Sequence, residues 1–103
     1  MFKLDPNPTF PAVVQISMPD GTSQPLAVTF NHKTTSAVQS YLDNAAGRSN
    51  ADMTAEIVAG VDGKAEGQSD AEFFAALFES YPAAASDVLR TYLKQLTESR
   101  VKN

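Results

Sequence analysis

The chain has 103 residues, of which 43% are hydrophobic and 19% charged. This length suits one domain with a modest core, and the apolar content excludes a wholly disordered chain. Eight Lys and Arg residues stand against twelve Asp and Glu residues, a net charge of −4, and no basic cluster of the kind that binds a phosphate backbone is present. Nucleic acid is therefore not an expected partner. The absence of cysteine excludes disulfides, thiolate catalysis and cysteine-based zinc sites.

The sequence contains no segment typical of a membrane or secreted protein. No apolar run follows Lys3, as a signal peptide would require. The longest apolar run, residues 73–78, is far shorter than the roughly 20 residues that span a bilayer. We therefore expect a soluble protein of the cytoplasm with no membrane partner.

Residues 1–11 are rich in proline, with Pro6, Pro8 and Pro11 between apolar side chains. Proline fixes φ and biases the preceding residue toward extended geometry. We therefore expect an extended arm rather than a helix in this segment.

Residues 12–30 have the pattern of a β-hairpin. Apolar side chains occupy alternate positions in residues 12–18 and again in residues 26–30, which is the period of a β-strand. Pro19-Asp20-Gly21 lies between the two runs and predicts a tight turn, because Pro presets φ and Gly tolerates a positive φ.

From residue 34 to about residue 100 the periodicity is helical, and it predicts four helices. The first three starts are each marked by a serine with a Gln, Asp or Glu three residues later: Ser36–Gln39, Ser49–Asp52 and Ser69–Glu72. The corresponding ends are marked by Gly47, Gly60 and Pro82. The fourth helix is expected from about residue 83 to the high nineties, with a wide apolar stripe and cations in its second half, as the helix dipole favours.

An arm and a hairpin followed by about four helices predict an α+β fold in a single domain covering residues 1–103. No arrangement of residues predicts an enzyme. His32 is the sole histidine, and it lacks the spacing to a nucleophile and an acid that catalysis requires. Residues 60–65 lack the glycine spacing of a phosphate-binding loop, and the loop from Asp62 lacks the carboxylates of a calcium loop. We expect no catalytic residue, metal, cofactor or small-molecule substrate.

Several short segments, in the right order along nearly the whole chain, resemble a family of phage tail assembly chaperones. They are Met1–Pro6, Pro8–Phe10, Phe30-x-His32-Lys33, Gly47–Ser49, Glu56–Gly60, Tyr81–Ala84, Tyr92-Leu93-x-x-Leu96 and Lys102-Asn103. Members of this family often carry Trp after the segment that ends at Gly60, where this chain has Val61. The resemblance implies a non-enzymatic protein of a long-tailed phage or prophage. It would bind the tape measure protein, keep that protein soluble and recruit tail-tube subunits in the host cytoplasm, without joining the finished particle.

Aromatic residues gather between residues 73 and 81, and their helical spacing is typical of a core. The apolar arc of this helix is nevertheless broad for a chain of this size, and exposed apolar surface on a small protein often marks a partner site. We therefore expect protein partners to contact the edges of the apolar helical faces: Phe73, Phe78, Tyr81 and Leu93. A small regulator or antitoxin-like module that uses the same surface is the alternative hypothesis.

Overall fold

A computed structural model describes residues 8–97 of the chain. Three strands and four helices follow one another in the order β1 (Thr9–Ser17), β2 (Ser23–Asn31), α1 (Thr35–Asp43), α2 (Asn50–Ile57), β3 (Val58–Val61), α3 (Asp70–Ser80) and α4 (Ala84–Thr97). The fold is α+β with a hairpin ahead of four helices, which confirms the predicted fold class.

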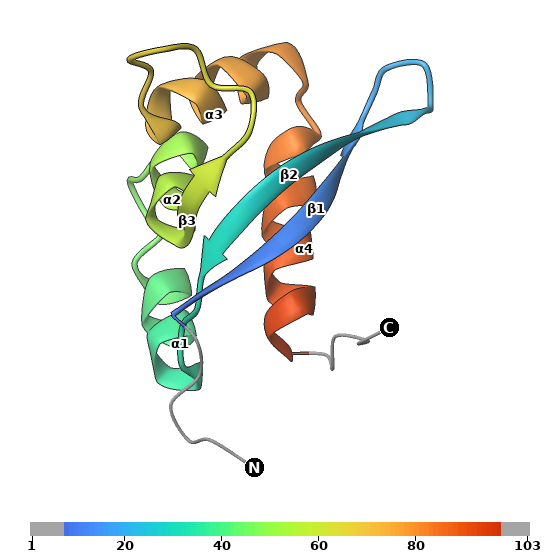
Figure 1. Cartoon of the computed structure of the whole chain (residues 1–103). Coiled ribbons are helices and arrows are strands. Elements are labelled where there is room, and N and C mark those ends of the chain that lie inside the picture. The colour runs from blue at the N-terminus through green and yellow to red at the C-terminus, as the bar shows by residue number, and fades with distance from the viewer. Residues whose placement is uncertain (1–7, 98–103) are drawn as a thin grey trace.

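The three strands form an antiparallel sheet in the order β1-β2-β3. Helix α4 lies across one face of β1 and β2, and α1, α2 and β3 lie beside it, along the left of the view (Figure 1). Helix α3 packs beside α2 and β3. Within residues 8–97, the sheet face opposite α4 carries no helix (Figure 1).

Alternation along the hairpin separates a core face from an open face. Phe10, Val14 and Ile16 on β1 are buried, as are Val28 and Phe30 on β2. Directly paired residues of an antiparallel sheet point to the same side, and the register pairs Phe10 with Phe30. The intervening residues of β1 are exposed, so one face of the hairpin builds the core and the other meets solvent.

The core is centred on an aromatic cluster that joins α4 to the hairpin. The ring of Tyr92, which is fully buried, lies 5.0 Å from Phe30 and 6.2 Å from Phe10, measured between ring centroids. Its hydroxyl donates a hydrogen bond of 2.8 Å to the carbonyl oxygen of Asn31. The cluster therefore fixes α4 both by apolar burial and by a directed polar contact.

A second contact fixes the other end of α4. The carboxylate of Asp87, 4% exposed, accepts a 2.8 Å hydrogen bond from the backbone N–H of Ser17. It also pairs with Arg90 at 2.7 Å. Asp87 thus connects the last residue of β1 to the first turn of α4, where the helix dipole favours a negative charge.

The outer edge of β1 contains a proline. His32 and Pro8 form a hydrogen-bonded pair, as do Met18 and Thr22. In the antiparallel pattern the intervening pairs, including Pro11 with Thr29, direct their backbone groups away from each other. Pro11 therefore faces the outer edge of β1, where no strand pairs within residues 8–97, and it removes no hydrogen bond from the sheet.

Two of the predicted helix starts are confirmed. The Ser49 hydroxyl accepts a hydrogen bond from the backbone of Asp52 at the start of α2. Ser69 and Glu72 form a complete capping box at the start of α3. Such side chains satisfy backbone N–H groups that the first turn leaves without partners.

The predicted boundaries of α1 need correction. Its N-cap is Thr34, whose hydroxyl accepts from the backbone of Ala37, and Ser36 lies inside the helix. The helix ends at Asp43, and Gly47 lies beyond it in a turn with a φ of +80°. Threonine at the boundary performs the capping that the prediction assigned to the nearby serine.

The second predicted helix ends early, because Val58–Val61 forms the strand β3 that the prediction missed. Val58 pairs with Phe30 and Gly60 pairs with Thr29, with a register shift between the two pairs. Gly60 is therefore a strand residue rather than a helix terminator. Pairing with β2 overrides the helical periodicity here, and the β-branched side chain of Val58 suits a strand. The hairpin is also longer than residues 12–30, since β1 begins at Thr9. Residues 1–7 of the predicted arm lie outside the described residues.

Removing the hydroxyl of Tyr92 tests the contact between α4 and the hairpin. Tyr92→Phe keeps the ring but removes the partly buried hydrogen bond to the carbonyl oxygen of Asn31, so we expect a loss of about 1–3 kcal/mol in the free energy of unfolding. Urea denaturation measures this loss, and the dependence of the free energy of unfolding on urea concentration should not change. Within residues 8–97 the tyrosine hydroxyls that donate hydrogen bonds are those of Tyr41 and Tyr92, so Tyr81→Phe is the matched control. Equal stability of the two variants would contradict the assignment.

Burial of two tyrosines predicts a loss of stability at high pH. Burial raises the pKa of Tyr41 and of Tyr92 from 10.0 to about 12. The unfolded chain therefore releases these protons first, and stability declines between pH 10 and 12, by up to about 1.4 kcal/mol per pH unit for each tyrosine. Urea denaturation at pH 9 and pH 11 should show a smaller decline in Tyr92→Phe than in the original chain. Parallel declines would contradict this origin of the pH dependence.

Candidate functional site

The aromatic residues of α3 divide between the core and its rim. Phe74 is fully buried, whereas Phe73 and Phe78 are half-buried. Both rings pack on Phe74, with centroid distances of 5.3 Å for Phe73 and 5.7 Å for Phe78. The cluster is therefore mostly core, and its two outer rings retain the partial exposure that partner binding would use.

The half-buried Tyr81, the residue after α3, belongs to a different surface. It lines an apolar hollow between the end of α3 and the outer part of the hairpin, which we call the hairpin hollow. The lining residues are Ile16, Met18, Gln24, Pro25, Leu26, Leu77 and Tyr81. Most are apolar, and methionine adapts readily to the shape of a partner.

Leu93 lines a groove on the outer side of α4, together with Ser86, Leu89, Arg90, Lys94 and Thr97. Leu89 also lines an adjoining depression between α4 and the pair α1 and α2. The other residues of this depression are Tyr41, Leu42, Ala45, Arg48, Asn50, Met53, Thr54 and Ala85. We call the two together the α4 groove. Leu42 is 38% exposed, so an apolar side chain of α1 faces solvent at this groove.

The charges at the α4 groove are ordered by ion pairs. Arg48 pairs with Glu56 at 2.6 Å, and Lys33 pairs with the same carboxylate at 3.1 Å. Hydrogen bonds from Arg48 and Lys33 hold the pKa of Glu56 below its ordinary value. On α4, Arg90 pairs with Asp87 yet keeps 69% of its side chain exposed. Lys94 has no ion-pair partner among residues 8–97.

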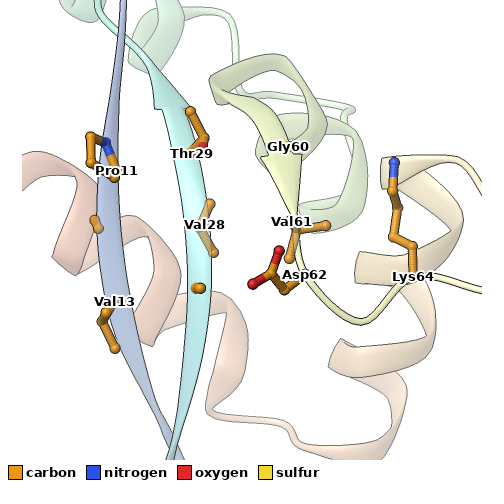
Figure 2. A pocket seen from close by; sticks show the side chains of 10 residues that line it. Pro11, Val13, Val28, Thr29, Gly60, Val61, Asp62 and Lys64 are labelled. Atoms are coloured by element: carbon orange, nitrogen blue, oxygen red, sulfur yellow. The ribbon is translucent and has the colours of Figure 1, made fainter.

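A third surface is a hollow on the open face of the sheet, which we call the sheet-face hollow (Figure 2). Ala27 and Gly60 contribute little or no side chain there, and Pro11 and Val13 lie along β1 at one side. Val13 is 56% exposed. Ala12, Val28, Thr29, Val61, Asp62 and Lys64 complete the lining. The lining of this hollow is thus mostly apolar, and its charged residues, Asp62 and Lys64, lie on the side of β3 (Figure 2).

The structure brings only part of the predicted set together. Phe73 and Phe78 flank Phe74 on α3, Tyr81 lies at the hairpin hollow, and Leu93 lies at the separate α4 groove. All four pack against the core cluster as half-buried residues.

Sequence reasoning missed two exposed apolar side chains that lie at these surfaces. Neither of them, Leu42 or Val13, is among the partner-binding residues predicted from the sequence. A signal was present for Val13, because Pro11 and Ala27 are also apolar at outward positions. No such signal was present for Leu42, because the apolar stripe of a helix does not show which of its residues the rest of the fold covers.

The described residues contain no group of three or more His, Cys, Asp or Glu side chains that could hold a metal ion. Within residues 8–97, no helix combines the length and the apolar character needed to cross a membrane. Apolar hollows and grooves are instead the prominent surface features, and these are typical of a protein that binds other proteins.

Comparison with known families agrees with this class. The family model described as phage tail assembly chaperone matches residues 1–103, the whole chain. The protein therefore belongs to the phage tail assembly chaperone family. Comparison with the curated proteins and with the solved structures gives no match.

Filling the sheet-face hollow should not disturb the fold. A Cβ atom at Gly60 would meet nothing within 4 Å, and a β-branched residue suits a strand better than glycine does. We expect Gly60→Val to leave the free energy of unfolding unchanged or to raise it by up to about 1 kcal/mol. Gly47→Val is the contrast, since Gly47 has a φ of +80° and the variant should lose at least about 1 kcal/mol. Thermal or urea denaturation checks both; a larger loss in Gly60→Val would contradict the open geometry.

Proposed function

We propose that this protein binds the tape measure protein of a long-tailed phage or prophage, keeps it soluble and promotes assembly of the tail tube around it in the host cytoplasm. The observation that supports this most directly is membership of the tail assembly chaperone family over the whole chain. In this proposal the protein acts by binding and catalyses no reaction, and its partners are the tape measure protein and tail-tube subunits.

The surfaces of the molecule fit such a role. A long helical client exposes apolar stripes before it is assembled, and these aggregate unless another apolar surface covers them. The rim residues Phe73 and Phe78, together with Tyr81 in the hairpin hollow and Leu93 in the α4 groove, offer half-buried apolar contacts. We assign partner binding to these four residues.

Co-expression tests the proposal. The tape measure protein from the same genome should be insoluble alone, and should become soluble and co-purify when this chain is present. If it stays insoluble and nothing co-purifies with a folded chain, the tail-assembly proposal is wrong and a binding module for another partner takes its place.

Charged variants test the assigned residues in the same assay. Leu93→Asp and Phe78→Asp place a charge in an apolar contact, which costs several kcal/mol if the contact is desolvated in the complex. Both should abolish solubilisation while the far-ultraviolet circular dichroism spectrum stays folded. Val13→Asp is the matched control, since it puts the same charge on the open face of the sheet and should retain solubilisation. If Phe78→Asp unfolds, Tyr81→Ser tests the same side of the molecule; full solubilisation by folded Leu93→Asp and Tyr81→Ser would refute the assignment.

A further inference from the structure

The α4 groove combines an apolar stripe with a cationic stripe. Ala85, Leu89 and Leu93 lie at intervals of four residues along α4, and so fall on one line of its surface. Each is followed by a more polar residue, and these residues, Ser86, Arg90 and Lys94, form the neighbouring line. Such a pair of parallel lines matches the surface of one amphipathic helix.

The opposite wall of the groove, formed by α1, α2 and the residues between them, also carries apolar and cationic side chains. Leu42 and Met53 supply apolar surface from α1 and α2, and Arg48 supplies a cation that is paired with Glu56 at 2.6 Å. Leu42 is one of the two large hydrophobic side chains that are exposed in the described part of the chain. The groove therefore has apolar walls on two sides with cations along its rim.

The charged side chains that line this groove are cations, although the chain as a whole is acidic. The net charge is −4, yet among the described residues no Asp or Glu lines the α4 groove. Arg90 is mostly exposed in spite of its pair with Asp87, and Lys94 lacks an ion-pair partner within residues 8–97. A partner with acidic side chains beside an apolar stripe would meet complementary charge there and be disfavoured elsewhere on the acidic surface.

We propose that the α4 groove binds an amphipathic helical segment of a partner protein whose apolar stripe is bordered by Asp and Glu. A helix of about four turns would run the length of α4, about 21 Å. Its leucine-like side chains pack between Leu42 and Leu89, and its carboxylates approach Arg90 and Lys94. This proposal names the chemistry of the client segment and rests on the proposed function for the identity of the partner.

Two synthetic helical peptides with the same leucine stripe provide the test. One is bordered by Glu and the other by Lys, and binding to the full chain is measured by fluorescence anisotropy. We expect the Glu peptide to bind at least about tenfold more tightly at low salt, and this preference to shrink at 1 M salt, where charges are screened within about 3 Å. Equal affinities would overturn the proposal.

Variants locate the binding. Lys94→Glu should weaken binding of the Glu peptide about tenfold by reversing a rim charge, and Leu42→Ala should weaken it about fivefold by removing partly exposed apolar surface. Lys64→Glu and Val13→Ala make the same changes at the sheet-face hollow and should leave binding unchanged. If the variants at the sheet-face hollow weaken peptide binding as much as the variants in the α4 groove do, the peptide binds elsewhere and the proposal is overturned. Binding to phosphatidylglycerol vesicles is measured by co-sedimentation. If the chain sediments with the vesicles and the Glu peptide does not release it, the proposal is also overturned, in favour of a membrane surface.

The same variants separate this inference from the proposed function. If the original chain solubilises the tape measure protein and Lys94→Glu does not, both stand. If Lys94→Glu and Leu42→Ala solubilise it fully, the groove is not its site and this inference fails alone. If the Glu peptide binds in the groove but no tape measure protein is rescued, the proposed function fails and the specificity of the groove stands.

Discussion

The packing of Tyr92 against the hairpin is the constraint on which the rest of the fold depends. Its ring closes the aromatic cluster with Phe10 and Phe30, and its hydroxyl caps the carbonyl at the end of β2. Asp87 makes the second attachment, through the N–H of Ser17. Two polar contacts about a turn and a half apart along α4 therefore set both its position on the sheet and its rotation about its own axis. That rotation decides which side chains of α4 face outward.

Those outward side chains follow from the small size of the chain. One helix covers one face of β1 and β2, and within residues 8–97 no helix covers the other face (Figure 1). With Val88 and Tyr92 turned to the core, Leu89 and Leu93 must occupy the flank of α4. A domain of this size buries only about two-thirds of its unfolded surface, so apolar side chains remain at the margins. In the function proposed above, these margins would be the surface that contacts a partner.

Much of the fold could be predicted because local signals agree with it. Alternation in the hairpin and the capping box of Ser69 and Glu72 depend on neighbours in sequence, and the structure confirms them. Strand β3 could not be predicted, since the extended conformation of Val58 arises from pairing with Phe30, a residue far away in the chain. The exposure of side chains could not be predicted for the same reason, because it depends on contacts between residues far apart in the chain. Leu42 lies in a helix, as the periodicity from residue 34 predicts, but its exposure depends on how far α1 stands from α4, a tertiary property that periodicity does not contain.

The free edge of β1 has a consequence for the protein's own behaviour at high concentration. An exposed strand edge can recruit a strand from another molecule through its unpaired N–H and C=O groups. Here Pro11 has no N–H to offer, and the outward N–H of Ser17 is already bound to Asp87. Pro11 and Ser17 therefore offer no donor to a second strand, and a ladder along this edge would be interrupted at both positions. The edge of β1 is in this way a poor template for a strand of another molecule, including a second copy of this chain.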